Sequence, residues 1–175
     1  MQTFKIALTI LFALLVQYLL PNYLPFFKYI DLPLVVTVYF GLQRNPVLGM
    51  LMGAAVGIGG DSIIGGVLGV GGFSKTLIGY LVAMASIKLS LENPLVRVAV
   101  VAVASAANTL LFAALYQMLE LPLRGASTWG ELGKMIGWRA LADTATSIIV
   151  FIVLDRVFAE QTAARRMAIK RRFYE

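Results

Sequence analysis

The fold of this chain is decided by the glycine-rich stretch GMLMGAAVGIGGDSIIGGVLG, residues 49–69. Its small and acidic residues recur at every fourth position, at Gly49, Gly53, Gly57, Asp61, Gly65 and Gly69. Residues four apart lie nearly above one another on an α-helix, so the first three glycines form a groove without side chains. Such grooves let two helix backbones approach closely inside a bilayer. We therefore expect a membrane helix that packs against another helix through this groove.

The composition predicts a membrane protein. The 175 residues are 59% hydrophobic with a mean hydropathy of +0.83, and 14% are charged, against about 25% in soluble domains. Residues 6–27 and 98–119 contain no charged side chain, and each stretch is long enough to cross a core of ~30 Å at ~1.5 Å per residue. Cysteine and histidine are absent, which excludes disulfides, thiol chemistry and imidazole-based catalysis. We expect no cofactor and no metal.

We expect an all-α polytopic membrane protein with six transmembrane helices in one compact bundle, formed by residues 1–160, and a basic cytoplasmic tail, residues 161–175. Pro21 and Pro25 are expected to close the first span, and the second and third spans are short enough to be tilted or broken. The expected spans are Phe4–Leu20, Leu32–Leu42, Pro46–Ile64, Phe73–Leu89, Pro94–Leu119 and Met135–Phe158.

The basic residues predict that both termini are cytoplasmic. Six spans place the termini on one side, and that side then holds two thirds of the 15 Lys and Arg residues. The positive-inside rule favours this orientation, although the excess depends on the tail. The inner set is Lys5, Arg44, Lys88, Arg97, Arg156, Arg165, Arg166, Lys170, Arg171 and Arg172, and the outer set is Lys28, Lys75, Arg124, Lys134 and Arg139.

Two interpretations of the groove stay open: packing against another helix of this chain, or docking of a partner's helix on Gly49, Gly53, Gly57 and Asp61. Association in lipid relies on close backbone approach, and both interpretations satisfy that requirement. Asp61 is either an interfacial residue at the end of its span or the partner of a cation, Lys75 or Arg139 of this chain or one of another protein.

Further polar residues are expected inside the membrane, where they usually face protein or water. Arg139 and Asp143 are four apart and can pair on one helix face. Asn108 lies deep in the fifth span and is expected to form a hydrogen bond to another helix, worth on the order of 1 kcal/mol. Arg165, Arg166, Lys170, Arg171 and Arg172 predict attraction of the tail to anionic lipids at roughly 1 kcal/mol per charge, or docking of an acidic cytoplasmic partner.

An enzymatic role is not expected. A hydrolase needs an activated nucleophile with a base, but His and Cys are absent, and the one Ser/Lys pair within a predicted site, Ser74–Lys75, consists of sequence neighbours. The segment from Gly69 to Thr76 is similar to a phosphate-binding loop, but Ser74 stands where that motif requires glycine before Lys75. No strand is predicted before it, so we expect no nucleotide site.

Taken together, the sequence resembles the MreD family of rod shape-determining proteins of the bacterial inner membrane. The residues that carry the resemblance are Asp31-Leu-Pro33, Val38-Tyr39-Phe40-Gly41-Leu42, Arg44-Asn45-Pro46, the glycines that lead to Asp61, Gly69, and Leu77-Ile78-Gly79-Tyr80-Leu81. The resemblance is strongest over residues 31–81, and the size, the number of spans and the short loops also agree.

The resemblance implies a non-enzymatic membrane scaffold of the cell-wall elongation complex that helps to position or regulate peptidoglycan synthesis. Its direct partner would be MreC, through the transmembrane helix of that protein, with indirect links to MreB, RodA and the transpeptidase of RodA. No nucleic acid is implied.

The family's fold is also similar to the S-components of energy-coupling-factor transporters, six-helix subunits that bind vitamins. A small-molecule-binding subunit of a transporter is therefore the alternative function. Many S-components carry an Ala-x-x-x-Ala docking motif in the first span, whereas Ala7 and Ala13 are six apart here. This departure disfavours the alternative.

Overall fold

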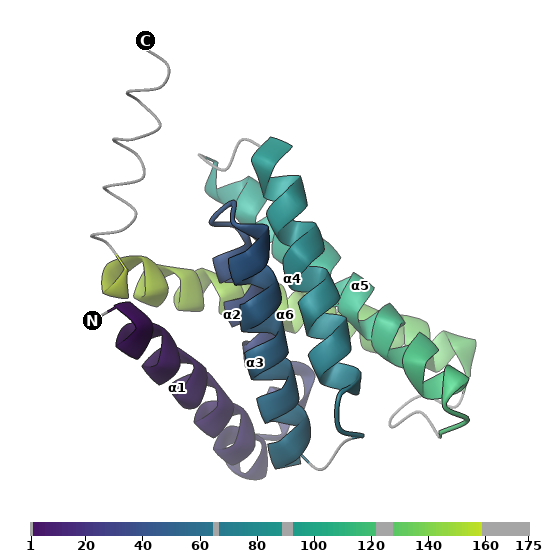
Figure 1. Ribbon diagram of the computed structural model, residues 1–175. Coiled ribbons are helices and arrows are strands. Elements are labelled where there is room, and N and C mark those ends of the chain that lie inside the picture. Colours follow the sequence, from purple (N-terminus) through teal and green to yellow (C-terminus); the bar gives the residue numbers. More distant parts are fainter. Residues whose placement is uncertain (1, 65–66, 89–92, 122–127, 159–175) are drawn as a thin grey trace.

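The computed structural model describes residues 2–64, 67–88, 93–121 and 128–158, which form a bundle of helices around a short central one (Figure 1). Six α-helices and one short 3₁₀ helix, η1, make up the regular structure of this part of the chain. Their bounds are α1, Gln2–Tyr23; η1, Pro25–Tyr29; α2, Leu32–Gly41; α3, Pro46–Ile64; α4, Val70–Lys88; α5, Pro94–Met118; and α6, Trp129–Val157. The expected all-α fold is confirmed.

Several helix ends differ from expectation for local reasons. α1 continues through Pro21 to Tyr23, so the proline lies in the last turn and does not end the helix. α6 begins at Trp129 and not at Met135, because Thr128 and Glu131 form a reciprocal capping box at its start.

The central helix is α2, and all ten of its residues are buried. At ~1.5 Å per residue it covers about half of a ~30 Å hydrocarbon core, so it does not cross a bilayer by itself. It contacts α1, α3, α4, α5 and α6, which surround it. Its uniformly apolar sequence is therefore that of a core helix wrapped by other helices.

The six helices therefore differ in how far they could extend across a membrane, as the short second span led us to expect. Among the described residues four helices, α1, α3, α4 and α5, are both long and apolar enough to cross a membrane. α6 has 29 residues and sufficient length, but charged residues in its first half make it more polar. In Figure 1 it runs across the bundle behind α2, α3 and α4.

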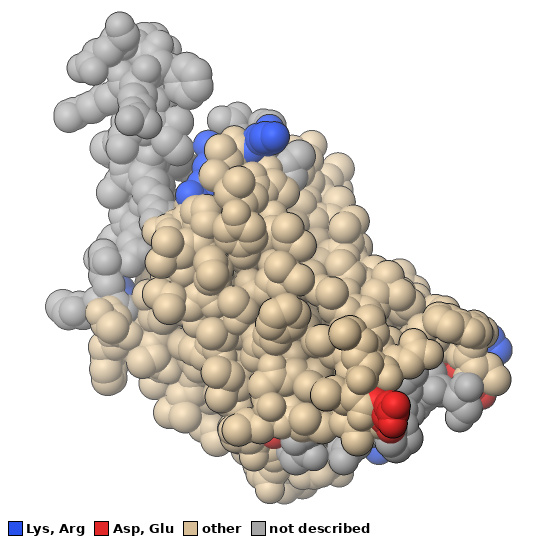
Figure 2. All heavy atoms as spheres, turned by 45° about the vertical axis from the view of Figure 1, so that its right-hand side comes forward, with Lys and Arg blue, Asp and Glu red and all other residues tan. Residues whose placement is uncertain are grey.

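The outer surface of the bundle is apolar. Large hydrophobic side chains on every long helix are exposed, among them Phe12 on α1, Val103 on α5 and Ile149 on α6. Figure 2 shows a broad face with almost no charged residue: Lys and Arg lie at its upper end, and acidic residues together with some basic ones lie along its lower and right edges. A soluble protein rarely exposes such a surface, whereas lipid chains cover it at no cost.

Candidate functional site

The glycine groove of α3 is filled by α4 of the same chain. A Cβ atom on Gly49 would meet the carbonyl of Gly79, and one on Gly57 would meet the carbonyl of Gly71. Between them a Cβ on Gly53 would overlap the carbonyl of Lys75. α3 and α4 form the most extensive helix pair of the bundle. The structure thus supports internal packing, and the predicted docking of a partner's helix in this groove is corrected, because α4 occupies the space.

Asp61 holds the start of α4. One of its carboxylate oxygens accepts hydrogen bonds from the backbone N–H groups of Gly69, Gly71 and Gly72, at 2.9, 2.9 and 3.2 Å. Gly69 has φ +97°, which turns these N–H groups toward one point. A carboxylate there also complements the positive end of the helix dipole. Asp61 is 9% exposed and serves as a cap, and it forms no ion pair with a Lys or Arg of the described residues.

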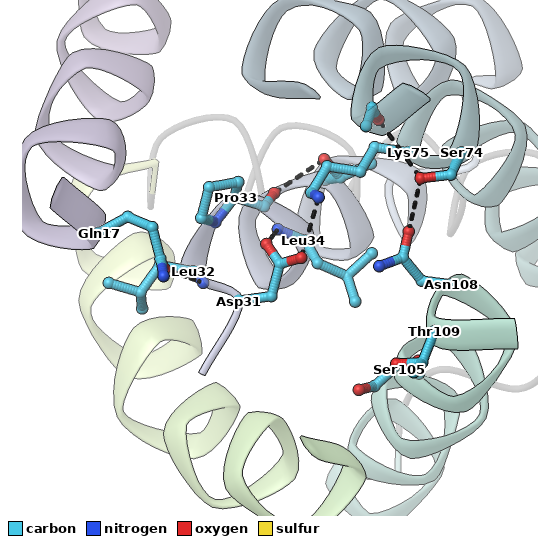
Figure 3. A network of polar contacts seen from close by, with 12 residues as sticks. Gln17, Asp31, Leu32, Pro33, Leu34, Ser74, Lys75, Ser105, Asn108 and Thr109 are labelled. Atoms are coloured by element: carbon cyan, nitrogen blue, oxygen red, sulfur yellow. Dashed lines mark hydrogen bonds and ion pairs between the residues drawn. The ribbon is translucent and has the colours of Figure 1, made fainter. Parts of the chain in front are cut away.

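An ion pair lies at the N-terminal end of α2. The Lys75 ammonium is 2.9 Å from Oδ2 of Asp31, and the two side chains are 10% and 20% exposed (Figure 3). The other carboxylate oxygen of Asp31 accepts a hydrogen bond from the Leu34 N–H at 3.0 Å, which caps α2. The pair therefore joins α4 to the start of the central helix.

Asp143 connects α6 to the N-terminal end of α2. Its Oδ1 accepts a hydrogen bond from the Asp31 N–H at 2.7 Å, and its Oδ2 accepts one from the Ser105 hydroxyl of α5 at 2.5 Å. The predicted pair between Asp143 and Arg139 is not formed within the described residues. Asp143 is 1% exposed, so the backbone and hydroxyl donors replace the water that it lacks.

Two amides complete the polar network. The Gln17 side chain donates to the Ile30 carbonyl and accepts from the Leu32 N–H, both at 2.9 Å, which fastens α1 to the chain before α2. The structure has the hydrogen bond between helices that we expected of Asn108: its Oδ1 accepts from the Ser74 hydroxyl at 3.0 Å. Figure 3 shows these residues converging from different helices on the middle of the bundle.

A cavity of about 230 Å³ lies beside this network. Its charged lining residues are Lys28, Asp31, Asp61, Lys75 and Arg139. Its other walls include Gln17, Pro33, Asn108, Thr109, Phe112, Tyr116 and Met135. The sequence indicated the polar residues one by one but not the space between them.

A second polar cluster, which sequence reasoning missed, lies toward the C-terminal end of α2. Arg97 donates two hydrogen bonds to Asp155, at 2.9 and 3.3 Å, and the Tyr39 hydroxyl donates to the same carboxylate at 3.1 Å. The guanidinium carbon of Arg97 is 4.9 Å from the ring centroid of Phe151. Arg97 and Asp155 are 58 residues apart, so no local pattern could have paired them.

Within the described residues, no group of three or more His, Cys, Asp or Glu side chains is placed to hold a metal ion. The predicted tail residues Arg165, Arg166, Lys170, Arg171 and Arg172 lie outside the described residues.

The chain matches the family model described as rod shape-determining protein MreD over residues 1–154. No curated protein and no solved structure matches it. The family match covers nearly all of the helical bundle, including both polar clusters apart from Asp155. The chain therefore belongs to the MreD family, and its role lies in determining rod shape.

Proposed function

We propose that the chain is a non-enzymatic membrane scaffold of the cell-wall elongation complex, which binds MreC and helps to position or regulate peptidoglycan synthesis. The observation that carries the proposal is the family match over residues 1–154. The structure is compatible with a scaffold, because the buried carboxylates Asp61 and Asp143 are bound by hydrogen-bond donors of the bundle itself.

The glycine groove is not the site of contact in this proposal, since α4 fills it. The helix of MreC would instead lie on the apolar outer surface. A crosslinking scan tests this by placing a photo-reactive phenylalanine analogue at exposed positions on different helices: Phe12, Phe73, Val103 and Ile149. Adducts with MreC on one face and not on the others support the scaffold. Failure of every position to yield an adduct, together with no MreC in protein purified from native membranes, would contradict it.

The second candidate is the small-molecule-binding subunit of a transporter, and the observation that favours it is the cavity. Its volume of about 230 Å³ lies below the ~300–1,000 Å³ of pockets for drug-sized ligands, which disfavours a vitamin. Mass spectrometry of the natively purified protein separates the candidates. MreC in the preparation supports the scaffold, whereas a pair of ATPases with a bound vitamin supports the transporter.

We also propose that the protein lies in the bacterial inner membrane with both termini in the cytoplasm. Basic residues of the inner set contact segments that the same orientation places on the cytoplasmic side: Lys5 donates to the Val157 carbonyl, Arg44 to the Ser86 carbonyl and Arg97 to Asp155. Cysteine accessibility tests the orientation, because the chain has no natural cysteine. A cysteine at Lys88 is expected to resist a membrane-impermeant thiol reagent in intact cells, and one at Lys28 to react.

We further propose that the basic residues of the tail attract anionic lipids. Replacing the five basic residues of the tail with Gln is expected to weaken the binding of the protein to anionic vesicles in low salt. The expected loss of binding free energy is roughly 1 kcal/mol per charge removed. Vesicle flotation at low and high ionic strength measures the change. An affinity that neither salt nor the substitutions alter would point to an acidic protein partner instead.

A further inference from the structure

The cavity contains hydrogen-bond donors that the fold does not use. Arg139 lines it and makes no hydrogen bond or ion pair within the described residues. Asn108 is 2% exposed and uses its carbonyl oxygen on Ser74, while its Nδ2 donates to none of the residues described. In Figure 3 that nitrogen points away from Ser74 toward the middle of the bundle. The Tyr116 hydroxyl likewise has no hydrogen-bond partner in this part of the chain.

These donors reach open space. Every fully buried side-chain nitrogen or oxygen of the described residues has a hydrogen-bond partner. The unused atoms of Asn108 and Tyr116 are therefore accessible from the cavity, although both residues are almost completely buried. Donors kept without partners at this depth are costly unless water or a ligand binds them.

The acceptors around the cavity are already engaged. Both oxygens of Asp31 are used, one by Leu34 and one by Lys75, and the Asp61 carboxylate is bound by the backbone of α4. Lys28 and Arg139 then form no ion pair with an acid of the cavity lining, and Arg139 interacts with the charge of Asp143, outside the lining, only at longer range. The unsatisfied groups are donors and positive charges, which suit an anion.

The position of the cavity suits a headgroup. Lys28 is exposed, and Arg139 follows Trp138, which is 60% exposed. Exposed indoles of membrane proteins concentrate at the level of the headgroups. The stacked rings of Phe112 and Tyr116, with centroids 4.8 Å apart, give the cavity an apolar wall beside its donors.

We propose that this cavity binds a phosphate group, either that of a lipid headgroup or that of a small soluble phosphate ester. A phosphate presents several strong acceptor oxygens in different directions, and the unused donors come from η1, α5 and α6. Arg139 forms the charge-assisted hydrogen bonds, and Lys28 attracts the anion at the entrance. The phosphate site is independent of the docking of MreC.

Binding is tested with the full chain in a maltoside detergent that carries no phosphate. Short-chain phosphatidic acid, glycerol 3-phosphate and inorganic phosphate are added in turn, and the rise in the thermal unfolding midpoint with concentration gives each affinity. Arg139→Gln is expected to weaken binding roughly tenfold or more, the factor for one charge-assisted hydrogen bond. The matched control is Arg156→Gln, an exposed arginine in the last turn of the same helix, and it is expected to have no effect.

The outcomes are distinguishable. Stabilisation by phosphatidic acid alone identifies a lipid headgroup, and equal stabilisation by glycerol 3-phosphate or inorganic phosphate identifies a soluble ligand. If Arg139→Gln does not fold, Lys28→Gln replaces it, because the Lys28 side chain is exposed and its removal disturbs no packing. No stabilisation by any of the three compounds would overturn the proposal. So would equal weakening by the cavity variant and by Arg156→Gln, since that pattern indicates unspecific attraction to the surface.

Discussion

The two ends of α2 use polar residues in opposite ways. At the C-terminal end, Tyr39 and Phe40 pack with the rings of Phe151 and Phe158, and the Arg97–Asp155 pair closes over them. At the N-terminal end, the Asp31–Lys75 pair lies beside a cavity of about 230 Å³. The C-terminal end of α2 is packed with aromatic side chains, whereas the N-terminal end borders a cavity.

This difference separates stabilising polar contacts from those available for binding. In the filled cluster every charged group faces an opposite charge, and aromatic rings occupy the remaining volume. In the open cluster Arg139 forms no hydrogen bond or ion pair within the described residues, and the amide nitrogen of Asn108 donates to none of them. Because unpaired donors are expensive in a membrane, their retention around a cavity indicates a ligand more strongly than the ion pairs do.

The largest expected effect compares Asp31→Asn with Asp155→Asn. Loss of the Asp31 charge leaves the Lys75 ammonium, 10% exposed, without its counter-ion, and we expect a loss of about 3 kcal/mol in the free energy of unfolding. The Asp155 side chain is 41% exposed, and solvent screens its pair, so we expect its substitution to cost well under half as much. Reversible unfolding in mixed detergent micelles measures both.

A matched double variant sharpens this test. Adding Lys75→Met to Asp31→Asn removes the stranded charge and is expected to restore part of the lost stability. Equal losses for Asp31→Asn and Asp155→Asn would mean that water enters the N-terminal end freely, and the two ends would not differ as described.

A smaller effect is expected from added methyl groups. Gly49→Ala would press a Cβ against the Gly79 carbonyl and push α4 away, at about 2 kcal/mol. Gly60→Ala is the control on the same helix: it lines the cavity, and the nearest atom to its added Cβ is Leu14 Cδ2 at 4.0 Å. It is expected to be neutral or stabilising, because alanine favours helix by up to ~1 kcal/mol. If Gly60→Ala lowered the free energy of unfolding as much as Gly49→Ala, the part of the bundle beside the cavity would be packed as tightly as the glycine groove.

The sequence predicted the elements of this fold better than their partners. The helix Pro46–Ile64 was predicted with the bounds that the structure has, because proline and the glycine repeat are local signals. The start of α6 has a local signal as well, the capping pair Thr128 and Glu131, which lies before the predicted start at Met135. The shortness of α2 was visible, yet its position at the centre of the bundle depends on five other helices.

The candidate site was predicted only in part. Asp61 and Asn108 were singled out because polar residues are rare in apolar segments, and both are engaged in the structure. The partners of these polar residues could not be derived from the sequence. Lys75, for example, was a candidate partner of Asp61 but forms its ion pair with Asp31. Only tertiary packing brings Arg139, Asn108 and Tyr116 around one volume, and no periodicity encodes that volume.

The smallest expected effect concerns the cap that adjoins the cavity. Asp61→Ala removes the acceptor for the N–H groups of Gly69, Gly71 and Gly72, and the loss of a cap costs typically ~1 kcal/mol. Thr128→Ala, which removes the exposed cap of α6, is the matched variant and is expected to cost a similar amount or less. The two differ in their effect on the cavity, because Asp61 lines it and Thr128 does not. If Asp61 only caps α4, phosphate binding by Asp61→Ala stays equal or tightens as a negative charge is lost. Weaker binding would instead mean that the start of α4 helps to form the site.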